Sequence, residues 1–172
     1  MSDVLLAEGR FLRLLRKPSG WEYCERANCQ WAVVIAARTP EGRVLLVEQT
    51  RPPVEGRVIE LPAGLVGDTA ADSGESWREA ARRELIEETG YDADLLEEVA
   101  RGPVSPGLGT ERIVLVRATG LRRVASGGGV DAEDIIVHEV PLDELEGWLR
   151  ERMAAGIQVD PKLFAGIYFL RP

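Results

Sequence analysis

The sequence has few of the residues that build disulfide-linked or zinc-stabilised proteins, because only two of its 172 residues are cysteine and only one is histidine. Cys24 and Cys29 are too few for a disulfide framework or a four-cysteine zinc site, so we expect reduced thiols and a cytoplasmic protein. Long apolar runs are also missing. The longest, Trp31 to Ala37, has seven residues, whereas a membrane helix needs about 20. The first residues show no long apolar core, so no signal peptide is expected.

The sequence also has few positively charged residues. It contains 21 lysines and arginines and 29 acidic residues, which gives a net charge of −8. A general nucleic-acid binder with this balance would repel the phosphates of its own ligand. A polyanionic substrate meets the same repulsion unless a cation lies between it and the protein. The length and the 45% of hydrophobic residues suit one soluble globular domain over 1–172, with no membrane partner.

Short apolar runs separated by turn residues predict strands along much of the chain. They comprise 11–16 and 21–23, which would pair as a hairpin, then 30–37, 44–47, 58–61, 94–100, 112–118 and 134–140. One central helix is predicted at 77–89, because Ser76 and Glu79 have the spacing of a capping box and Gly90 stands where a helix ends. Two further helices, 142–155 and 161–170, would close the chain, so we expect an α+β fold.

The central helix carries an unusual concentration of negative charge. Glu84, Glu87 and Glu88 are three and four residues apart, which puts their side chains on one side of a helix. Like charges at this spacing destabilise a helix, and a helix C-terminus also disfavours negative charge. Clustered carboxylates suit Mg²⁺ or Mn²⁺, which keep water ligands and bind phosphates. The alternative is a solvated acidic face that nearby arginines neutralise.

The surroundings of these glutamates resemble the signature of the Nudix hydrolases. Seven residues separate Glu75 from the run Arg83-Glu84-Leu85-Ile86-Glu87-Glu88-Thr89-Gly90, which matches the family box in register. Tyr91 replaces the usual aliphatic residue that follows. Ten residues instead of five separate the box glycine, Gly64, from Glu75, so we expect an insertion in the loop between Gly67 and Gly74.

The resemblance implies an α/β/α sandwich in which a mixed sheet carries the catalytic helix, and hydrolysis of a nucleoside diphosphate linked to another group. It implies a divalent cation, Mg²⁺ with Mn²⁺ as a substitute. The implied ligands are Glu84 and Glu88, with Glu87 as a ligand or a partner of one, and the backbone carbonyl of Ala63. Arg83 would orient the glutamates through ion pairs, with Glu75 as a partner; otherwise it is a surface arginine on a helix.

The residue that activates water is implied to lie in an acidic loop after the box. Glu133 is the first candidate, as the base or as an additional metal ligand, and Asp131 is the second. The preceding glycines, 127–129, would form a flexible segment that lets this loop close over the substrate. These acids are otherwise solvent-facing loop residues, in which case Glu84 is the base.

Further segments resemble the ADP-ribose pyrophosphatase branch of the family. They are 48–53, 60–64, 105–107 with 110–112, and 156–162. Carried over to this chain, the resemblance implies substrate contacts by Arg51, Glu60, Gly107 and Glu111. Alternatively Arg51 merely follows a strand and Glu111 pairs with the neighbouring Arg112. The substrate would be ADP-ribose, cleaved to AMP and ribose 5-phosphate.

Other substrates fit the same box, among them GDP-mannose, other nucleotide sugars and dinucleoside polyphosphates. Oxidised nucleoside triphosphates fit less well, because the segments 60–64 and 105–107 would then have no purpose. A non-catalytic ADP-ribose sensor is a remote alternative. Relatives commonly form homodimers through N-terminal strands, here within 1–29, ahead of a core over 30–172. We interpret Trp31 as a core or interface residue and His138 as structural.

Overall fold

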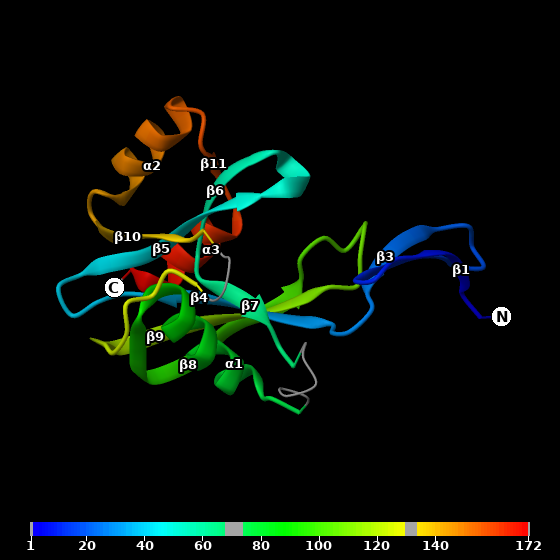
Figure 1. The fold of residues 1–172 in the computed structure, drawn as a ribbon, viewed down its shortest axis with the longest axis horizontal. Helices are drawn as coiled ribbons and strands as arrows, with labels where there is room; N and C mark the ends of the chain where they lie inside the picture. The colour runs from blue at the N-terminus through cyan, green and yellow to red at the C-terminus, as the bar shows by residue number, and fades with distance from the viewer. Residues whose placement is uncertain (1, 68–73, 130–133, 172) are drawn as a thin grey trace.

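The computed structural model describes residues 2–67, 74–129 and 134–171 (Figure 1). Strands make up most of the regular structure, with a few short helices between and after them, and the α+β prediction is confirmed. In chain order the elements are β1 (Val4–Glu8), β2 (Leu12–Arg16), β3 (Glu22–Arg26), β4 (Trp31–Ala37), β5 (Arg43–Arg51), η1 (Pro52–Val54), β6 (Gly56–Glu60), β7 (Ala63–Leu65), α1 (Trp77–Glu84), η2 (Leu85–Thr89), β8 (Tyr91–Pro103), β9 (Arg112–Arg123), β10 (Ile136–Pro141), α2 (Leu145–Ala154), β11 (Gln158–Val159) and α3 (Lys162–Leu170).

The strands form two mixed sheets and one antiparallel sheet. The first mixed sheet has the order β7-β4-β9-β8, in which β4 and β9 run parallel and the other pairs are antiparallel. The second has the order β10-β5-β6-β11, with only β6 and β11 parallel. The sheet β1-β2-β3 is antiparallel throughout.

Helices cover both faces of the β7-β4-β9-β8 sheet, as the sandwich prediction requires. Successive residues of a strand point to opposite faces. Accordingly Val33 and Ile35 of β4 join a core cluster with Ala80 and Ala81 of α1 and with Leu85 of η2. Val34 and Ala36 join a second cluster, which contains Leu163 and Ile167 of α3. Burying each large aliphatic side chain contributes about 1.5–3 kcal/mol, so these two clusters fix α1 and α3 on the sheet.

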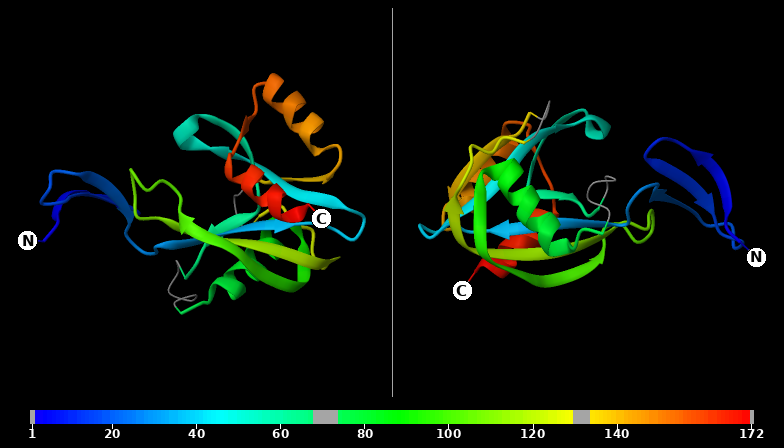
Figure 2. Two further views of the ribbon diagram at one scale, coloured as in Figure 1. Left: turned by 180° about the vertical axis from the view of Figure 1, so that it is seen from behind. Right: turned by 60° about the horizontal axis from the view of Figure 1, so that its bottom comes forward.

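The N-terminal sheet extends away from the rest of the molecule, with the N-terminus at its far end (Figures 1 and 2). The predicted hairpin is present, and β2 pairs with β3 from Leu12↔Arg26 to Arg16↔Glu22. The sheet is attached to the core through the loop that joins β8 and β9. There the amide of Cys24 donates to the carbonyl of Leu108 at 2.8 Å, and the amide of Thr110 donates to the carbonyl of Cys24 at 3.1 Å. Strand β1 was not predicted, because all five of its residues are exposed and show no burial pattern.

The central helix differs from its prediction in one respect. It begins with the expected capping box, but its α-helical part ends at Glu84 and the next five residues form a π-helical turn. The hydroxyl of Thr89 donates to the carbonyl of Leu85 at 2.5 Å within this turn. Gly90 then ends the helix with a φ of 80°. A π-helical turn inside a helix frequently marks a functional site.

Other boundaries also differ from the sequence prediction. Strand β8 starts at Tyr91, three residues before the predicted start, and α2 starts at Leu145 because Pro141 to Glu144 form a turn. Neither β7 nor β11 was predicted, since both are very short. Among the residues that the structure describes, no helix is long and apolar enough to cross a membrane.

Candidate active site

The glutamates lie where the catalytic helix passes the short strand β7. Helix α1 packs against β4, β7 and β8 (Figure 1). Glu88 is buried, with 5% of the residue exposed, and its Oε2 accepts a hydrogen bond from the backbone amide of Ala63 at 3.0 Å. This contact joins the π-helical turn to the first residue of β7. It also offsets part of the cost of burying a negative charge.

Gly64 is required by the close approach of Glu84 to β7. A Cβ atom at Gly64 would lie 1.8 Å from Oε1 of Glu84 and 1.9 Å from its Cδ. These distances are far below van der Waals contact, so no other residue fits here unless the glutamate moves. The glycine thus lets the carboxylate rest directly on the strand backbone.

Arg83 holds the acidic side chains together. Its Nε and Nη2 donate to the two carboxylate oxygens of Glu75 at 2.9 and 3.0 Å, and Nη2 also donates to the carbonyl of Leu65 at 3.2 Å. Its Nη1 lies 2.7 Å from Oε1 of Glu84 and 3.3 Å from Oε2 of Glu87. The Glu75 hydrogen bonds, followed by the attraction of Glu84, raise the pKa of Arg83 well above its usual range. The predicted ion pair with Glu75 is therefore present, and the guanidinium neutralises much of the like-charge repulsion.

The donor set around this point fits a hard divalent cation. Ala63, Glu84 and Glu88 all border one cavity, and carboxylate and carbonyl oxygens are the ligands that Mg²⁺ and Mn²⁺ prefer. Within the described part of the chain, no group of three acidic, histidine or cysteine side chains is already arranged to hold a metal. Glu84 and Glu87 instead form ion pairs with Arg83.

This cavity, of about 380 Å³, also contains most of the predicted substrate-binding residues. Arg51 and Glu60 line it as an ion pair, with Nε of Arg51 2.7 Å from Oε2 of Glu60. Burial raises the pKa of Glu60, and the hydrogen bond from Arg51 opposes that rise. Glu111 lines the same cavity and pairs with Arg26 of β3, not with its neighbour Arg112.

Four polar residues of the cavity were not predicted to line it. They are Arg26, Gln49, Asp160 and Lys162. Asp160 and Lys162 reach the cavity because β11 runs parallel to β6, and the amide of Asp160 donates to the carbonyl of Ile59 at 3.0 Å. Arg26 reaches it through the attachment of β3 to the β8–β9 loop. Both arrangements join segments that are far apart in the sequence. The resemblance of 156–162 to the family was the one sequence feature that pointed to Asp160 and Lys162.

The remaining predicted residues lie elsewhere. Gly107 does not line the cavity, and Glu87 contacts Arg83 without bordering it. Glu133 and Asp131 lie outside the described residues. His138 is hydrogen-bonded to Glu48 at 2.8 Å and stacks edge-on against Trp148, which agrees with a structural role.

The glycine segment 127–129, which the sequence predicts to be flexible, is hydrogen-bonded to the end of the helix. The amides of Gly128 and Gly129 donate to the carbonyls of Glu88 and Glu87 at 2.8 and 3.0 Å. The glycines therefore attach this segment to the catalytic helix. Their sequence suggested flexibility because glycine tolerates many conformations, but here the tract adopts one that bonds to the helix end.

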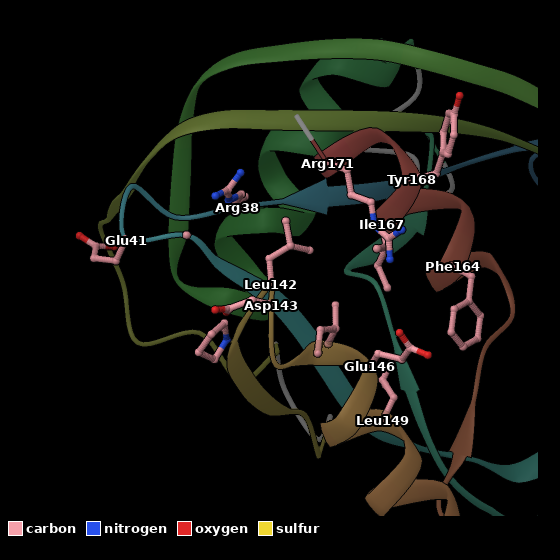
Figure 3. Close-up of a pocket in the computed structure, with 13 residues that line it drawn as sticks. Arg38, Glu41, Leu142, Asp143, Glu146, Leu149, Phe164, Ile167, Tyr168 and Arg171 are labelled. Atoms are coloured by element: carbon pink, nitrogen blue, oxygen red, sulfur yellow. The ribbon is translucent and has the colours of Figure 1, made fainter.

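A larger cavity, of about 960 Å³, lies between α2, α3 and the turn that follows β4 (Figure 3). Arg38, Glu41, Asp143 and Arg171 are among the residues around it. It contains none of the box glutamates and no residue of β7. Size alone would favour it, but the chemistry favours the smaller cavity beside Glu84 and Glu88.

Comparison with known proteins identifies the family of this chain. The model of the NUDIX domain matches residues 30–158, which is most of the chain. Together with the carboxylate helix on its mixed sheet, this match shows that the chain belongs to the Nudix family. The crystal structure of an ADP compounds hydrolase has the same fold, with a TM-score of 0.71 over 99% of this chain and 89% of that one, at 22% sequence identity.

Relatives of known name share about a third of their residues with this chain. The methanol dehydrogenase activator of Bacillus methanolicus is 36% identical over 70% of this chain, and the ADP-ribose pyrophosphatase of Bacillus subtilis is 34% identical over 66%. The matched segment spans 63% and 59% of the length of these two proteins. The GDP-mannose pyrophosphatase of Cronobacter sakazakii is 33% identical over 93% of this chain and 79% of its own length.

Proposed function

We propose that the chain is a metal-dependent hydrolase that cleaves the pyrophosphate bond of ADP-ribose to AMP and ribose 5-phosphate, or that of a related nucleotide sugar. One observation carries the proposal. A single cavity contains Glu84 and Glu88 of the catalytic helix together with three ion pairs supplied by other elements, Arg51–Glu60, Arg26–Glu111 and Lys162–Asp160. This reaction requires carboxylates that bind a cation. It also requires polar groups beside them that bind the nucleoside and the sugar.

The metal would be Mg²⁺, with Mn²⁺ as a substitute. Glu84, Glu87 and Glu88 and the carbonyl of Ala63 would hold it, and Glu133 would be an additional ligand. Bound there, a divalent cation neutralises charge on the phosphate oxygens and makes an attacking water more nucleophilic. The support for this site is the approach of Glu84 to Gly64, which leaves no space for a side chain at that position.

The chain's own groups would position the reactants and move one proton. Arg83 keeps Glu84 and Glu87 oriented through the contacts described above. A carboxylate then accepts a proton from the water that attacks phosphorus, while the other phosphate leaves. We assign this base to Glu133, with Asp131 next, and to Glu84 if neither acts.

Recognition of the rest of the substrate falls to the ion pairs. Glu60 and Glu111 would accept hydrogen bonds from ribose hydroxyls or from the base, and Arg51 would contact a phosphate or stack on the base. Gly107 would give the ligand access to backbone. The GDP-mannose pyrophosphatases among the relatives make GDP-mannose the main alternative substrate, followed by other nucleotide sugars and dinucleoside polyphosphates.

We further propose one domain over 1–172 that forms a homodimer in the cytoplasm, with no nucleic-acid or membrane partner. The N-terminal sheet within 1–29 supports the dimer. Its apolar side chains are exposed, Phe11 by 57% and Trp21 by 60%. Contact with a second copy would cover them. Size-exclusion chromatography with light scattering should then give twice 18.9 kDa.

The test of the activity is a substrate panel with purified protein and Mg²⁺, comparing kcat/KM for ADP-ribose, GDP-mannose and dinucleoside polyphosphates. A lead of about tenfold for ADP-ribose, equal to about 1.4 kcal/mol in the transition state, supports the assignment. A lead for another compound refutes the substrate but keeps the hydrolase. No cleavage with Mg²⁺ or Mn²⁺, combined with ADP-ribose binding, would instead identify a non-catalytic sensor.

A further inference from the structure

The segment that follows β9 returns to the end of the catalytic helix (Figure 2). The amides of Val124 and Ala125 donate to the carbonyl of Gly90 at 2.8 and 3.0 Å. The amides of Gly128 and Gly129 then donate to the carbonyls of Glu88 and Glu87 at 2.8 and 3.0 Å. Four hydrogen bonds therefore join this segment to the three residues that carry, or directly follow, the acidic turn.

The last carbonyls of a helix have no partner within the helix and need one outside it. Here the partners are backbone amides, which demand a close approach of the two chains. A Cβ atom at Gly127 would lie 2.4 Å from the carbonyl carbon of Thr89 and 2.7 Å from the amide nitrogen of Gly90. Gly127 also has a φ of 70°, in the left-handed region. Glycine at this position therefore meets both a steric and a conformational requirement.

We propose that the tract Gly127–Gly129 is a positioning element of the metal site, which holds the π-helical turn so that Glu87 and Glu88 present their carboxylates beside Glu84. The proposal rests on the proposed function, because it assigns a purpose to the tract only if these carboxylates bind a cation. Glycine has no side chain, so these three residues would not contact the substrate or the metal through one. The tract acts through the backbone of the residues that do.

Each of the two glutamates is held at both ends. The side chain of Glu88 accepts from the amide of Ala63 and its carbonyl accepts from Gly128. The side chain of Glu87 is paired with Arg83 and its carbonyl accepts from Gly129. A cation bound to these carboxylates would favour one conformation of the π-helical turn. The glycine tract is hydrogen-bonded to the backbone of the same turn. Binding of the cation and closure of the backbone hydrogen bonds must then favour each other reciprocally.

This reciprocity is measurable in the unmodified protein by amide hydrogen exchange with NMR detection, with and without Mg²⁺. The amides of Gly128 and Gly129 should exchange about tenfold more slowly when Mg²⁺ is bound, within the usual range of coupling between sites. The amides of Gly20 and Gly156 are internal controls, because both are hydrogen-bonded in turns elsewhere, at 2.9 and 3.0 Å. Equal exchange of Gly128 and Gly129 with and without bound Mg²⁺ would overturn the proposal.

A variant gives an independent measurement. Gly127→Ala should weaken Mn²⁺ binding, followed by electron paramagnetic resonance, by about tenfold or more, since a coupling of this size is typical. Gly156→Ala is the matched control, since Gly156 has a similar φ of 87° but no atom within 4 Å of its Cβ position. It should bind Mn²⁺ as the unmodified protein does.

The outcomes separate the positioning role from the function on which it rests. A folded Gly127→Ala variant with unchanged Mn²⁺ affinity refutes the positioning role and leaves the hydrolase intact. Absence of Mn²⁺ and Mg²⁺ binding by the unmodified protein refutes the proposed function, and the positioning role with it. If Gly127→Ala does not fold, the exchange rates of Gly128 and Gly129 in the unmodified protein decide the question.

Discussion

Replacing Gly64 by alanine should lower kcat/KM about 100-fold while leaving the fold intact. To reach an ordinary contact distance of 3.4 Å from the new Cβ, Oε1 of Glu84 must move by about 1.6 Å from its present 1.8 Å. The clashing atoms are the end of a flexible side chain, so the carboxylate turns away and the strand stays in place. A displacement of this size in a catalytic group reduces rates by about 100-fold, equal to about 2.7 kcal/mol.

The stability of the same variant should change little. An alanine that fits a strand gains about 0.4–1 kcal/mol from the lower entropy of the unfolded chain. The ion pair that Glu84 makes with Arg83 contributes about 0.2–1 kcal/mol, and its loss offsets that gain. We therefore expect the free energy of unfolding in urea to stay within about 1 kcal/mol of the original value.

The assay compares Gly64→Ala with Gly102→Ala, because Gly102 also lies in a strand and has no atom within 4 Å of its Cβ position. Both variants are measured for kcat/KM with ADP-ribose and for Mn²⁺ affinity. Loss in Gly64→Ala alone, with normal unfolding, supports the placement of Glu84 at the metal. A Gly64→Ala variant within threefold of the original in both quantities would refute the reasoning.

Three further predictions follow from the contacts. Arg83→Lys should lower kcat about 100-fold, because lysine keeps the charge but not the fork that binds two carboxylates; equal kcat would contradict this. Burial alone would raise the pKa of Glu48, but hydrogen bonds with His138 and Arg57 outweigh it and lower this pKa, so the stabilisation by Glu48 is complete above its ordinary pKa and is lost as the pH falls. Glu48→Gln should therefore reduce the free energy of unfolding by about 1–3 kcal/mol at pH 7 and by less at pH 3.5, measured in urea. Gly166→Ala should destabilise by about 1–3 kcal/mol, since its Cβ would lie 2.4 Å from Leu61, whereas Gly147→Ala in open space should stabilise slightly.

The sequence predicted the helix that carries the three glutamates well, because every feature of it is local. The capping box, the spacing of the three glutamates and the glycine at the end all fall within 15 residues, where helix geometry alone decides which side chains meet. The hairpin of the N-terminal sheet was predictable for the same reason. The π-helical turn was not predicted, and its carbonyls accept hydrogen bonds from residues 128 and 129 of a distant segment, which local sequence does not reveal.

The walls of the cavity were predicted less completely, because they depend on contacts across the chain. Arg26 meets Glu111 only after the N-terminal sheet has attached to the β8–β9 loop. Asp160 arrives beside Glu60 only after a two-residue strand has paired in parallel with β6. Nothing in the local sequence around Arg26 specifies such a partner. The resemblance to the family pointed to some of these residues, and the others were identified only from the structure.

Three carboxylates near the end of one helix repel one another, and several separate contacts offset this repulsion. Arg83 neutralises Glu84 and Glu87, the amide of Ala63 satisfies Glu88, and the glycine tract satisfies the helix carbonyls. Arg83 supplies positive charge to both Glu84 and Glu87, at 2.7 and 3.3 Å. A divalent cation at the proposed site would pair with Glu84 and Glu87 in place of Arg83, which would keep its hydrogen bonds to Glu75. These contacts offset the like-charge repulsion within an acidic cluster of a protein whose net charge is −8.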